Sequence, residues 1–184
     1  MVAINDRALK YLAGNANKIT SWYLNPLVWK WHADNWEWHP YPTSLPTPVF
    51  VAMNKALKRL VLKGLECHYE RQGRAAAMIR KGCVAMGFEV YCESEGFASP
   101  TITALITPQG LDEELLRNTV LADHDIMIAG GFGKLRGQVI RIGHMGPGIE
   151  DSYILATLNA IEAAVRKQGM DVAKGSAITA ALGS

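Results

Sequence analysis

A positively charged residue, Arg141, lies inside a short apolar stretch that is typical of a β-strand. Residues 138–143 read Gln-Val-Ile-Arg-Ile-Gly, so β-branched residues flank the arginine. A guanidinium that is buried without a partner is strongly unfavourable. Two interpretations follow. Arg141 faces solvent or pairs with a local carboxylate and only holds the sheet together, or its planar fork binds a substrate carboxylate, a task to which arginine is better suited than lysine.

A glycine-rich run, Gly130-Gly131-Phe132-Gly133, precedes this strand. In a dinucleotide-binding loop a helix follows the glycines directly, whereas here a turn and then the Arg141 strand follow. A hairpin-like turn that needs positive φ angles or close approach of the backbone explains the glycines better. We therefore expect no dinucleotide site.

Residues 13–48 form a connector that is rich in aromatic side chains. All five tryptophans fall here, interleaved with tyrosine and histidine, and four prolines between residues 40 and 48 are expected to break regular elements. Because each ring can bury a large apolar area, these side chains should not stay in water. They pack on the body of the same chain, or they cover another subunit or wall a pocket. The sequence leaves both open.

The connector also contains His32, Asp34 and His39, which are potential metal ligands. Their spacing matches no standard metal site, and the tryptophan and proline between them form a poor scaffold for one. We expect no metal.

The composition is that of an ordinary globular protein. The chain has 184 residues, of which 49% are hydrophobic and 20% are charged, and its net charge is only +2. This length suits one domain with a core, alone or with an appendage, and the charge predicts neither nucleic-acid nor membrane binding. The three cysteines lack metal-type spacing, which favours reduced thiols and a cytoplasmic location.

Periodicity and turn signals predict an α+β fold, with helices on one face of a small, mostly antiparallel sheet. A short strand at 1–4, without an evident partner, precedes a helix at 7–12. The order of the elements that follow the connector is two helices, two strands, a helix, two strands and a helix, at 49–62, 65–86, 88–92, 102–107, 112–123, 126–129, 139–142 and 149–168. A loosely attached short helix is expected in the tail. The expected parts are 1–48, the edge of a larger domain with its connector, then a small domain at 49–170, and the tail at 171–184.

Three stretches together resemble one family. They are Tyr41-Pro-Thr-Ser-Leu-Pro, Ala98-Ser-Pro-Thr-Ile-Thr-Ala, and Ile128-Ala-Gly-Gly-Phe-Gly ahead of Gly137-Gln-Val-Ile-Arg-Ile-Gly-His-Met-Gly. They are similar to the class V, fold-type I pyridoxal-phosphate aminotransferases of the alanine–glyoxylate and serine–pyruvate branch. The tail, Lys174-Gly-Ser-Ala-Ile-Thr-Ala-Ala, is similar to the pyridoxamine–pyruvate offshoot. The resemblance covers nearly the whole chain to about residue 170.

The resemblance implies roles for three residues. Arg141 matches the arginine that binds the α-carboxylate of the amino or 2-oxo acid, which shifts the balance toward the second interpretation above. Tyr41 and Ser44 match a Tyr-x-x-Thr element that reaches the phosphate of pyridoxal 5'-phosphate in the neighbouring subunit of a homodimer. Serine replaces threonine here and keeps the hydroxyl. The implied activity is transfer of an amino group between a small amino acid, alanine or serine, and glyoxylate or pyruvate.

The chain departs from the family in one respect that concerns catalysis. Family members bind the cofactor covalently through a lysine in a Ser-x-x-Lys context, and none of the ten lysines here has that context. Met1 therefore resembles an internal methionine of a longer enzyme, and the chain alone is expected to be inactive. Two alternatives remain: a stand-alone module that binds a small ligand or dimerises, and one half of a split transaminase whose N-terminal half is a separate chain.

Overall fold

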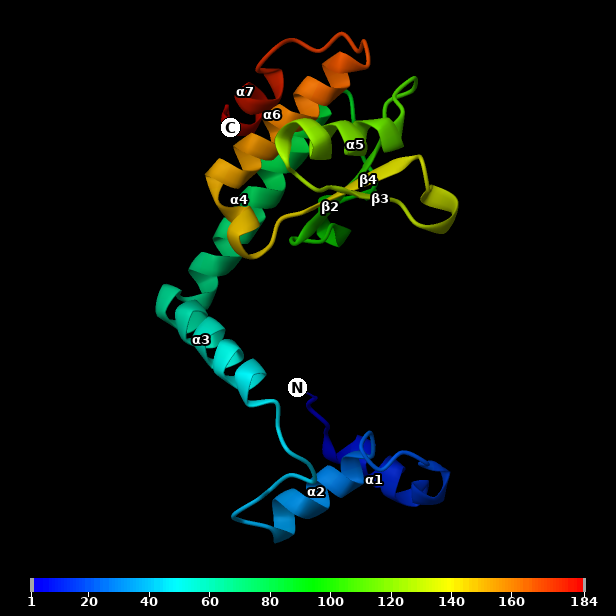
Figure 1. Cartoon of the computed structure of the whole chain (residues 1–184), viewed down its shortest axis with the longest axis vertical. Helices are drawn as coiled ribbons and strands as arrows, with labels where there is room; N and C mark the ends of the chain where they lie inside the picture. The colour runs from blue at the N-terminus through cyan, green and yellow to red at the C-terminus, as the bar shows by residue number, and fades with distance from the viewer. Residues whose placement is uncertain (1, 184) are drawn as a thin grey trace. The chain divides into compact units, whose positions relative to one another are not determined.

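The computed structural model describes residues 2–183 and divides into two compact units that meet between Lys58 and Arg59 (Figure 1). Each unit is considered by itself. None of the helices in the described part of the chain combines the length and the apolar character needed to cross a membrane.

The second unit contains one four-stranded sheet in which every neighbouring pair is antiparallel. Its order is β1-β2-β4-β3, with bounds Glu89–Val90, Ile102–Ile106, Val139–Gly143 and Ala129–Gly130 respectively. Arg141 lies at the centre of β4, where its Cα partners are Ala104 on β2 and Ala129 on β3. The position of this arginine is therefore set by strands on both sides.

Three helices cover one face of this sheet and a fourth packs beside them (Figure 1). They are α4 (Leu65–Val84), α5 (Glu113–His124), α6 (Asp151–Lys167) and α7 (Ser176–Leu182). Single-turn 3-10 helices occur at Glu95–Phe97, Gly133–Leu135 and Gly146–Ile149. The predicted order of helices and strands after the connector, and the mostly antiparallel sheet, are confirmed.

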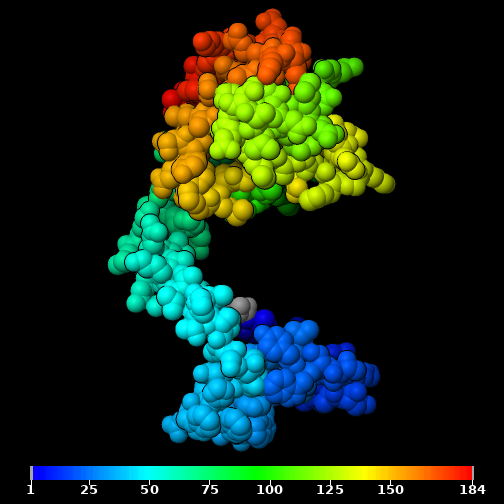
Figure 2. All heavy atoms as spheres, in the orientation of Figure 1, coloured from blue at the N-terminus to red at the C-terminus, as the bar shows by residue number. Residues whose placement is uncertain are grey.

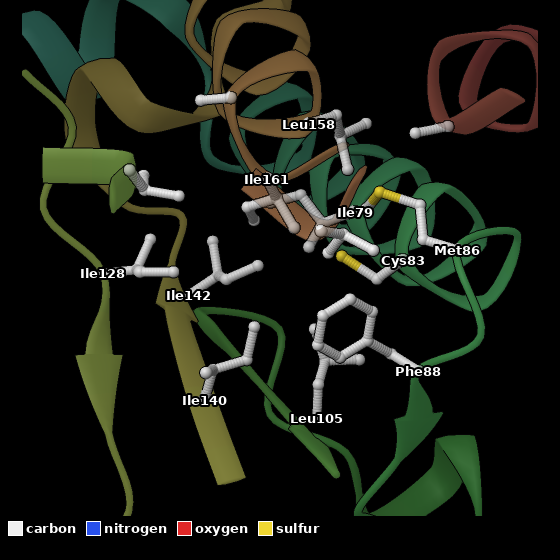
Figure 3. Packing of buried hydrophobic residues seen from close by; sticks show 14 of the residues in the cluster. Ile79, Cys83, Met86, Phe88, Leu105, Ile128, Ile140, Ile142, Leu158 and Ile161 are labelled. Atoms are coloured by element: carbon white, nitrogen blue, oxygen red, sulfur yellow. The ribbon is translucent and has the colours of Figure 1, made fainter. Parts of the chain in front are cut away.

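The core lies between the helices and the sheet. Side chains from α4, α6 and the strands point toward one another there, among them Ile79, Leu105, Ile140, Leu158 and Ile161 (Figure 3). The α6 side chains recur at helical spacing, as the sequence predicts. Burial of this cluster is what joins the helical layer to β4 and holds the strand that carries Arg141.

Local signals in the sequence set the ends of the helices. The Asp112 carboxylate accepts a hydrogen bond from the amide of Leu115 at 2.9 Å and caps α5. Gly64 precedes α4 with a φ of +83°, a backbone conformation that favours glycine and separates this helix from the one before it. These ends agree with the prediction because both devices act over only a few residues.

The tail is not loosely attached, contrary to the expectation. Helix α7 packs against α4 and α6, and its Ala177 and Ala181 are fully or almost fully buried. The buried carboxylate of Glu162 on α6 accepts hydrogen bonds from the amides of Gly175 (2.6 Å) and Ala177 (3.0 Å). A carboxylate that satisfies free amides at the start of a helix stabilises the helix there, which the composition of the tail does not reveal.

The first unit consists of helices joined by irregular segments. They are α1 (Asp6–Gly14), a 3-10 helix at Ala16–Lys18, α2 (Pro26–Asn35) and α3 (Thr47–Lys63), which runs across the boundary between the units. The predicted strand at 1–4 is wrong for residues 2–4, which have no regular structure, and Met1 lies outside the described residues. Helix α2 was not predicted, although Asn25 caps it and Pro26 occupies its first turn, both of which are known start signals.

No residue from Val2 to Arg71 is buried. Even the apolar face predicted for α3 is open, since Val49 is 61% exposed. The aromatic rings of the connector contact mainly one another, for example Trp36 stacked on Trp38 at 5.9 Å between ring centroids. This part of the chain lacks a core of its own.

Candidate functional site

Arg141 is half-buried and oriented by two contacts that leave part of its fork free. Its Nε donates a hydrogen bond to the carbonyl of Gly130 at 2.8 Å, and its guanidinium carbon lies 4.1 Å from the centre of the Phe132 ring. No carboxylate within residues 2–183 forms an ion pair with it. The interpretation in which Arg141 pairs with a local carboxylate is therefore excluded. The terminal nitrogens remain able to bind a planar anion in bidentate fashion.

The glycine-rich run forms the tight turn that brings Phe132 over Arg141. A Cβ on Gly131 would overlap the carbonyl of Leu135, and Gly133 and Gly137 have φ angles of +55° and +77°. The Leu135 amide closes the turn by donating to the Phe132 carbonyl at 3.0 Å. The predicted explanation of these glycines is confirmed.

The turn and Arg141 border a cavity of about 500 Å³. Its other side is formed by Glu113 and Arg117 of α5, which are joined by hydrogen bonds of 2.5 and 3.3 Å. The hydrogen bond to Glu113 raises the pKa of Arg117 above its ordinary value. A Cβ on Gly130 would lie 2.6 Å from a Glu113 oxygen, so this close packing of α5 on β3 requires glycine at that position.

A second cluster of polar groups surrounds His144, the residue that directly follows β4. His144 is fully buried, and its Nε2 lies 2.9 Å from the Thr103 hydroxyl. The Gln72 amide donates to the carbonyl of Pro100 at 2.8 Å and to the carbonyl of His144. Burial, and then the nearby charge of Arg80, lower the pKa of His144, so the ring is neutral and fixes the end of β4 against α4 and β2.

Known proteins match this chain in both sequence and structure. Pyridoxamine–pyruvate transaminase of Mesorhizobium japonicum is 32% identical over 184 residues, which cover 99% of this chain and 46% of that protein. A crystal structure of ureidoglycine–glyoxylate aminotransferase from Bacillus subtilis superimposes with a TM-score of 0.85 at 28% identity, over 98% of this chain and 46% of that one. A differently named protein, the soluble hydrogenase small subunit of a Synechococcus species, is 36% identical over 71% of this chain and 33% of its own length. No family model matches.

The chain belongs to the class V aminotransferases. It spans about half the length of the relatives it matches, consistent with their C-terminal portion. The predicted family and fold class are both confirmed.

The other two residues predicted for an aminotransferase site, Tyr41 and Ser44, lie in the first unit, between α2 and α3. The Tyr41 ring is half-buried and lies 4.2 Å from the His39 ring, between centroids, while Ser44 is exposed. Arg141 belongs to the second unit. The role predicted for Tyr41 and Ser44 stays a prediction.

Sequence reasoning missed several residues around Arg141. Phe132 was treated only as part of a turn, and Glu113 and Arg117 only as part of a helix. Glu113 and Arg117 are four residues apart at the start of a helix, and this spacing indicates an ion pair. The spacing does not show that the ion pair borders a cavity. Basic residues recur along the helix expected at 65–86, Arg80 among them, a pattern typical of a solvated face. Only 14% of the Arg80 side chain is exposed, however, and it donates a 3.0 Å hydrogen bond to the Ser99 carbonyl.

Proposed function

We propose that this chain supplies the C-terminal part of an aminotransferase that moves an amino group between a small amino acid, alanine or serine, and glyoxylate or pyruvate. The observation that carries the proposal is the state of Arg141, a half-buried guanidinium on a central strand with no carboxylate partner in the described chain. A ligand carboxylate is the natural partner for such a group. The names of the relatives support the reaction class.

Arg141 would bind the α-carboxylate and orient the bound acid. The hydrogen bond to Gly130 fixes the plane of the guanidinium, and Phe132 excludes water from one of its faces. Holding the acid at one end determines which bond at its Cα is presented for reaction. The buried hydrogen bonds of His144 with Thr103 and Gln72 fix the end of the same strand.

The cofactor of the family is pyridoxal 5'-phosphate, which supplies the electron sink for transamination. Its covalent attachment needs a lysine amine, and none of the ten lysines lines the Arg141 cavity. The cavity fits a substrate carboxylate but does not provide this attachment. We propose Tyr41 and Ser44 as hydroxyl ligands of the cofactor phosphate, and we expect no catalysis from this chain alone.

The proposed assembly is a cytoplasmic homodimer, and an N-terminal partner chain that carries the lysine is a further candidate. The supporting observation is the set of large apolar side chains that remain exposed before residue 71, among them Trp22, Trp31 and Trp38. Surfaces of this kind mark sites of protein association.

Binding of simple acids tests the proposal directly. Pyruvate and L-alanine are titrated into the full chain and followed by NMR chemical-shift changes. Arg141→Gln should weaken binding about tenfold to a hundredfold, because charge-assisted hydrogen bonds contribute about 1.5–3 kcal/mol. Arg141→Lys should retain part of the affinity, since it keeps the charge and loses the fork. The matched control is Arg166→Gln, which removes an exposed charge from α6. Equal binding by wild type and Arg141→Gln would refute the proposed role.

The alternative is a stand-alone module that binds a small ligand. It is considered because no lysine lines the Arg141 cavity. A second experiment separates this alternative from the transaminase proposal. Pyridoxal 5'-phosphate is added, the mixture is reduced with borohydride, and the intact mass is measured. We expect no stoichiometric adduct and no turnover of alanine with glyoxylate by the chain alone. If an added N-terminal chain of a family member restores turnover, the transaminase proposal is supported. A specific adduct on the chain alone would contradict our account of the cofactor.

A further inference from the structure

The cavity beside Arg141 holds more positive charge than binding of a single carboxylate requires. Three arginines line it, Arg117, Arg136 and Arg141, with Glu113 as the acidic residue. Both oxygens of Glu113 bind Arg117, so this carboxylate does not compensate the other two guanidinium groups. The lining therefore has an excess of two positive charges.

Arg136 lies in the glycine-rich turn that borders this cavity. The Arg136 amide donates to the Gly133 carbonyl at 3.3 Å, and the Gln138 amide donates to the Leu135 carbonyl at 3.1 Å. The close approach of Gly131 to the Leu135 carbonyl leaves no room for a side chain at that position. In the space-filling view the turn, coloured yellow to yellow-green, stands out from the body of the second unit (Figure 2). The backbone of the turn thus holds Arg136 at the rim of the cavity.

The guanidinium group of Arg136 is exposed and has no ion pair or side-chain hydrogen bond within residues 2–183. Arg141 occupies the deeper position, half-buried on the central strand of the sheet. Arg136 and Arg141 line the same cavity, so a ligand held at Arg141 by one carboxylate has a second guanidinium group within that cavity. Gly130, Gly131 and Gly133 also line the cavity and add no side chain to it.

We propose that the cavity accepts an α-amino or 2-oxo acid that carries a second anionic group at its far end, bound by Arg136. This inference rests on the proposed function, because it assigns the α-carboxylate to Arg141. It extends that function from alanine and serine to acidic substrates. A carboxylate and a phosphate both match the arginine fork, so the distal group is defined here by its charge.

The experiment compares ligands that differ only in the distal charge. The full chain is titrated by NMR with L-aspartate and its neutral isostere L-asparagine, and with O-phospho-L-serine and L-serine. We expect aspartate to bind about three- to tenfold more tightly than asparagine, a modest gain because the distal contact lies at an exposed rim. Added salt should reduce the difference, since exposed charges are screened.

Arg136→Gln should abolish this difference, because it lowers the affinity for aspartate more than the affinity for asparagine. Arg166→Gln removes the same charge from an exposed position on α6 and should have no effect. If only phosphoserine gains from the distal charge, and Arg136→Gln removes that gain, the distal group is a phosphate and the inference holds.

Two outcomes would overturn the inference. In the first, each charged ligand binds as tightly as its neutral partner, and Arg141→Gln binds none of them. This outcome rejects the distal site and leaves the proposed function intact. Absence of binding by any of the four ligands up to tens of millimolar rejects both the distal site and the proposed carboxylate site.

Discussion

At the scale of single residues, Arg141 is held by contacts that act on different parts of its guanidinium. The carbonyl of Gly130 accepts a hydrogen bond from Nε, and the Phe132 ring covers one face at 4.1 Å from the guanidinium carbon. Neither contact neutralises the charge. An arginine fixed in this way loses little conformational entropy when an anion binds, which is the advantage of a preformed site.

Removing the Phe132 ring should weaken this preformed state. Phe132→Ala is expected to reduce the affinity for pyruvate about two- to fivefold, because an exposed cation–π contact contributes about 0.5–1 kcal/mol. NMR titration measures the change. Phe97→Ala is the matched control, since Phe97 is 87% exposed and lies outside the cavity. If Phe132→Ala binds pyruvate as the wild type does, the ring plays no part in orienting Arg141.

His144 makes stability depend on pH in a defined direction. Burial lowers its pKa in the folded state below the ordinary value of 6.5, so the unfolded chain takes up a proton before the folded chain does. The free energy of unfolding should therefore fall as pH drops from 7 through 6.5 toward the folded pKa, and level off below it. Urea unfolding between pH 5.5 and 7.5 measures the slope. His144→Gln should reduce it and His39→Gln should not; an unchanged slope in a folded His144→Gln would contradict the assignment.

At the scale of elements, α7 is joined to the core by burial of small residues and by one carboxylate. Gly82 of α4 allows the close crossing, because a Cβ there would lie 2.7 Å from Leu158 and 3.0 Å from the Ala177 carbonyl. Glu162 then binds the amides at the start of the helix. Small-residue contact and a buried acceptor together dock a helix that is too short to be stable alone.

Loss of the Glu162 carboxylate should release α7 before the rest of the unit unfolds. Glu162→Ala leaves the amides of Gly175 and Ala177 without an acceptor, at a cost of about 1–3 kcal/mol. Hydrogen exchange of residues 176–182 should accelerate, while exchange in β4 changes less. Glu70→Ala, an exposed change on α4, serves as the control. Equal acceleration in β4 and α7 would mean that the helix opens only with the whole core.

At the scale of the molecule, burial is distributed unevenly between the two units. The second unit contains the whole buried cluster, whereas no residue from 2 to 71 is buried. The five tryptophans lie between residues 22 and 38, so their fluorescence reports on the first unit alone. A part of the chain with this much exposed aromatic surface gains stability when another chain covers it.

The proposed homodimer predicts protection of these tryptophans with increasing concentration. Acrylamide should quench their fluorescence efficiently at submicromolar concentration and less efficiently as a dimer forms. Light scattering gives the mass at each concentration, and a cavity variant such as Arg141→Gln should behave as the wild type does. A monomeric mass with constant quenching at all concentrations would contradict association through this surface.

Much of the fold could be predicted because its signals are local. The order of elements after the connector follows from apolar periodicity, and Asp112 and Gly64 mark helix ends through their own backbone and side-chain geometry. A strand around Arg141 was also predicted, from its β-branched residues. Its central position between β2 and β3 was not predicted and follows from the pairing in the structure. Edge strands were predicted too long: β3 is only Ala129–Gly130, because pairing with β4, and not composition, sets its length.

The sequence by itself determined the class of fold, the arginine within a short apolar strand and the lack of a lysine in a Ser-x-x-Lys context. Only the tertiary structure decided that Arg141 has no carboxylate partner in the described chain, that Phe132 covers it, that Arg136 shares its cavity and that the tail is docked. The physical reason is separation along the chain. Periodicity and capping act within a few residues, whereas Glu162 with Gly175, or α5 against β3, depends on where the whole core places each element.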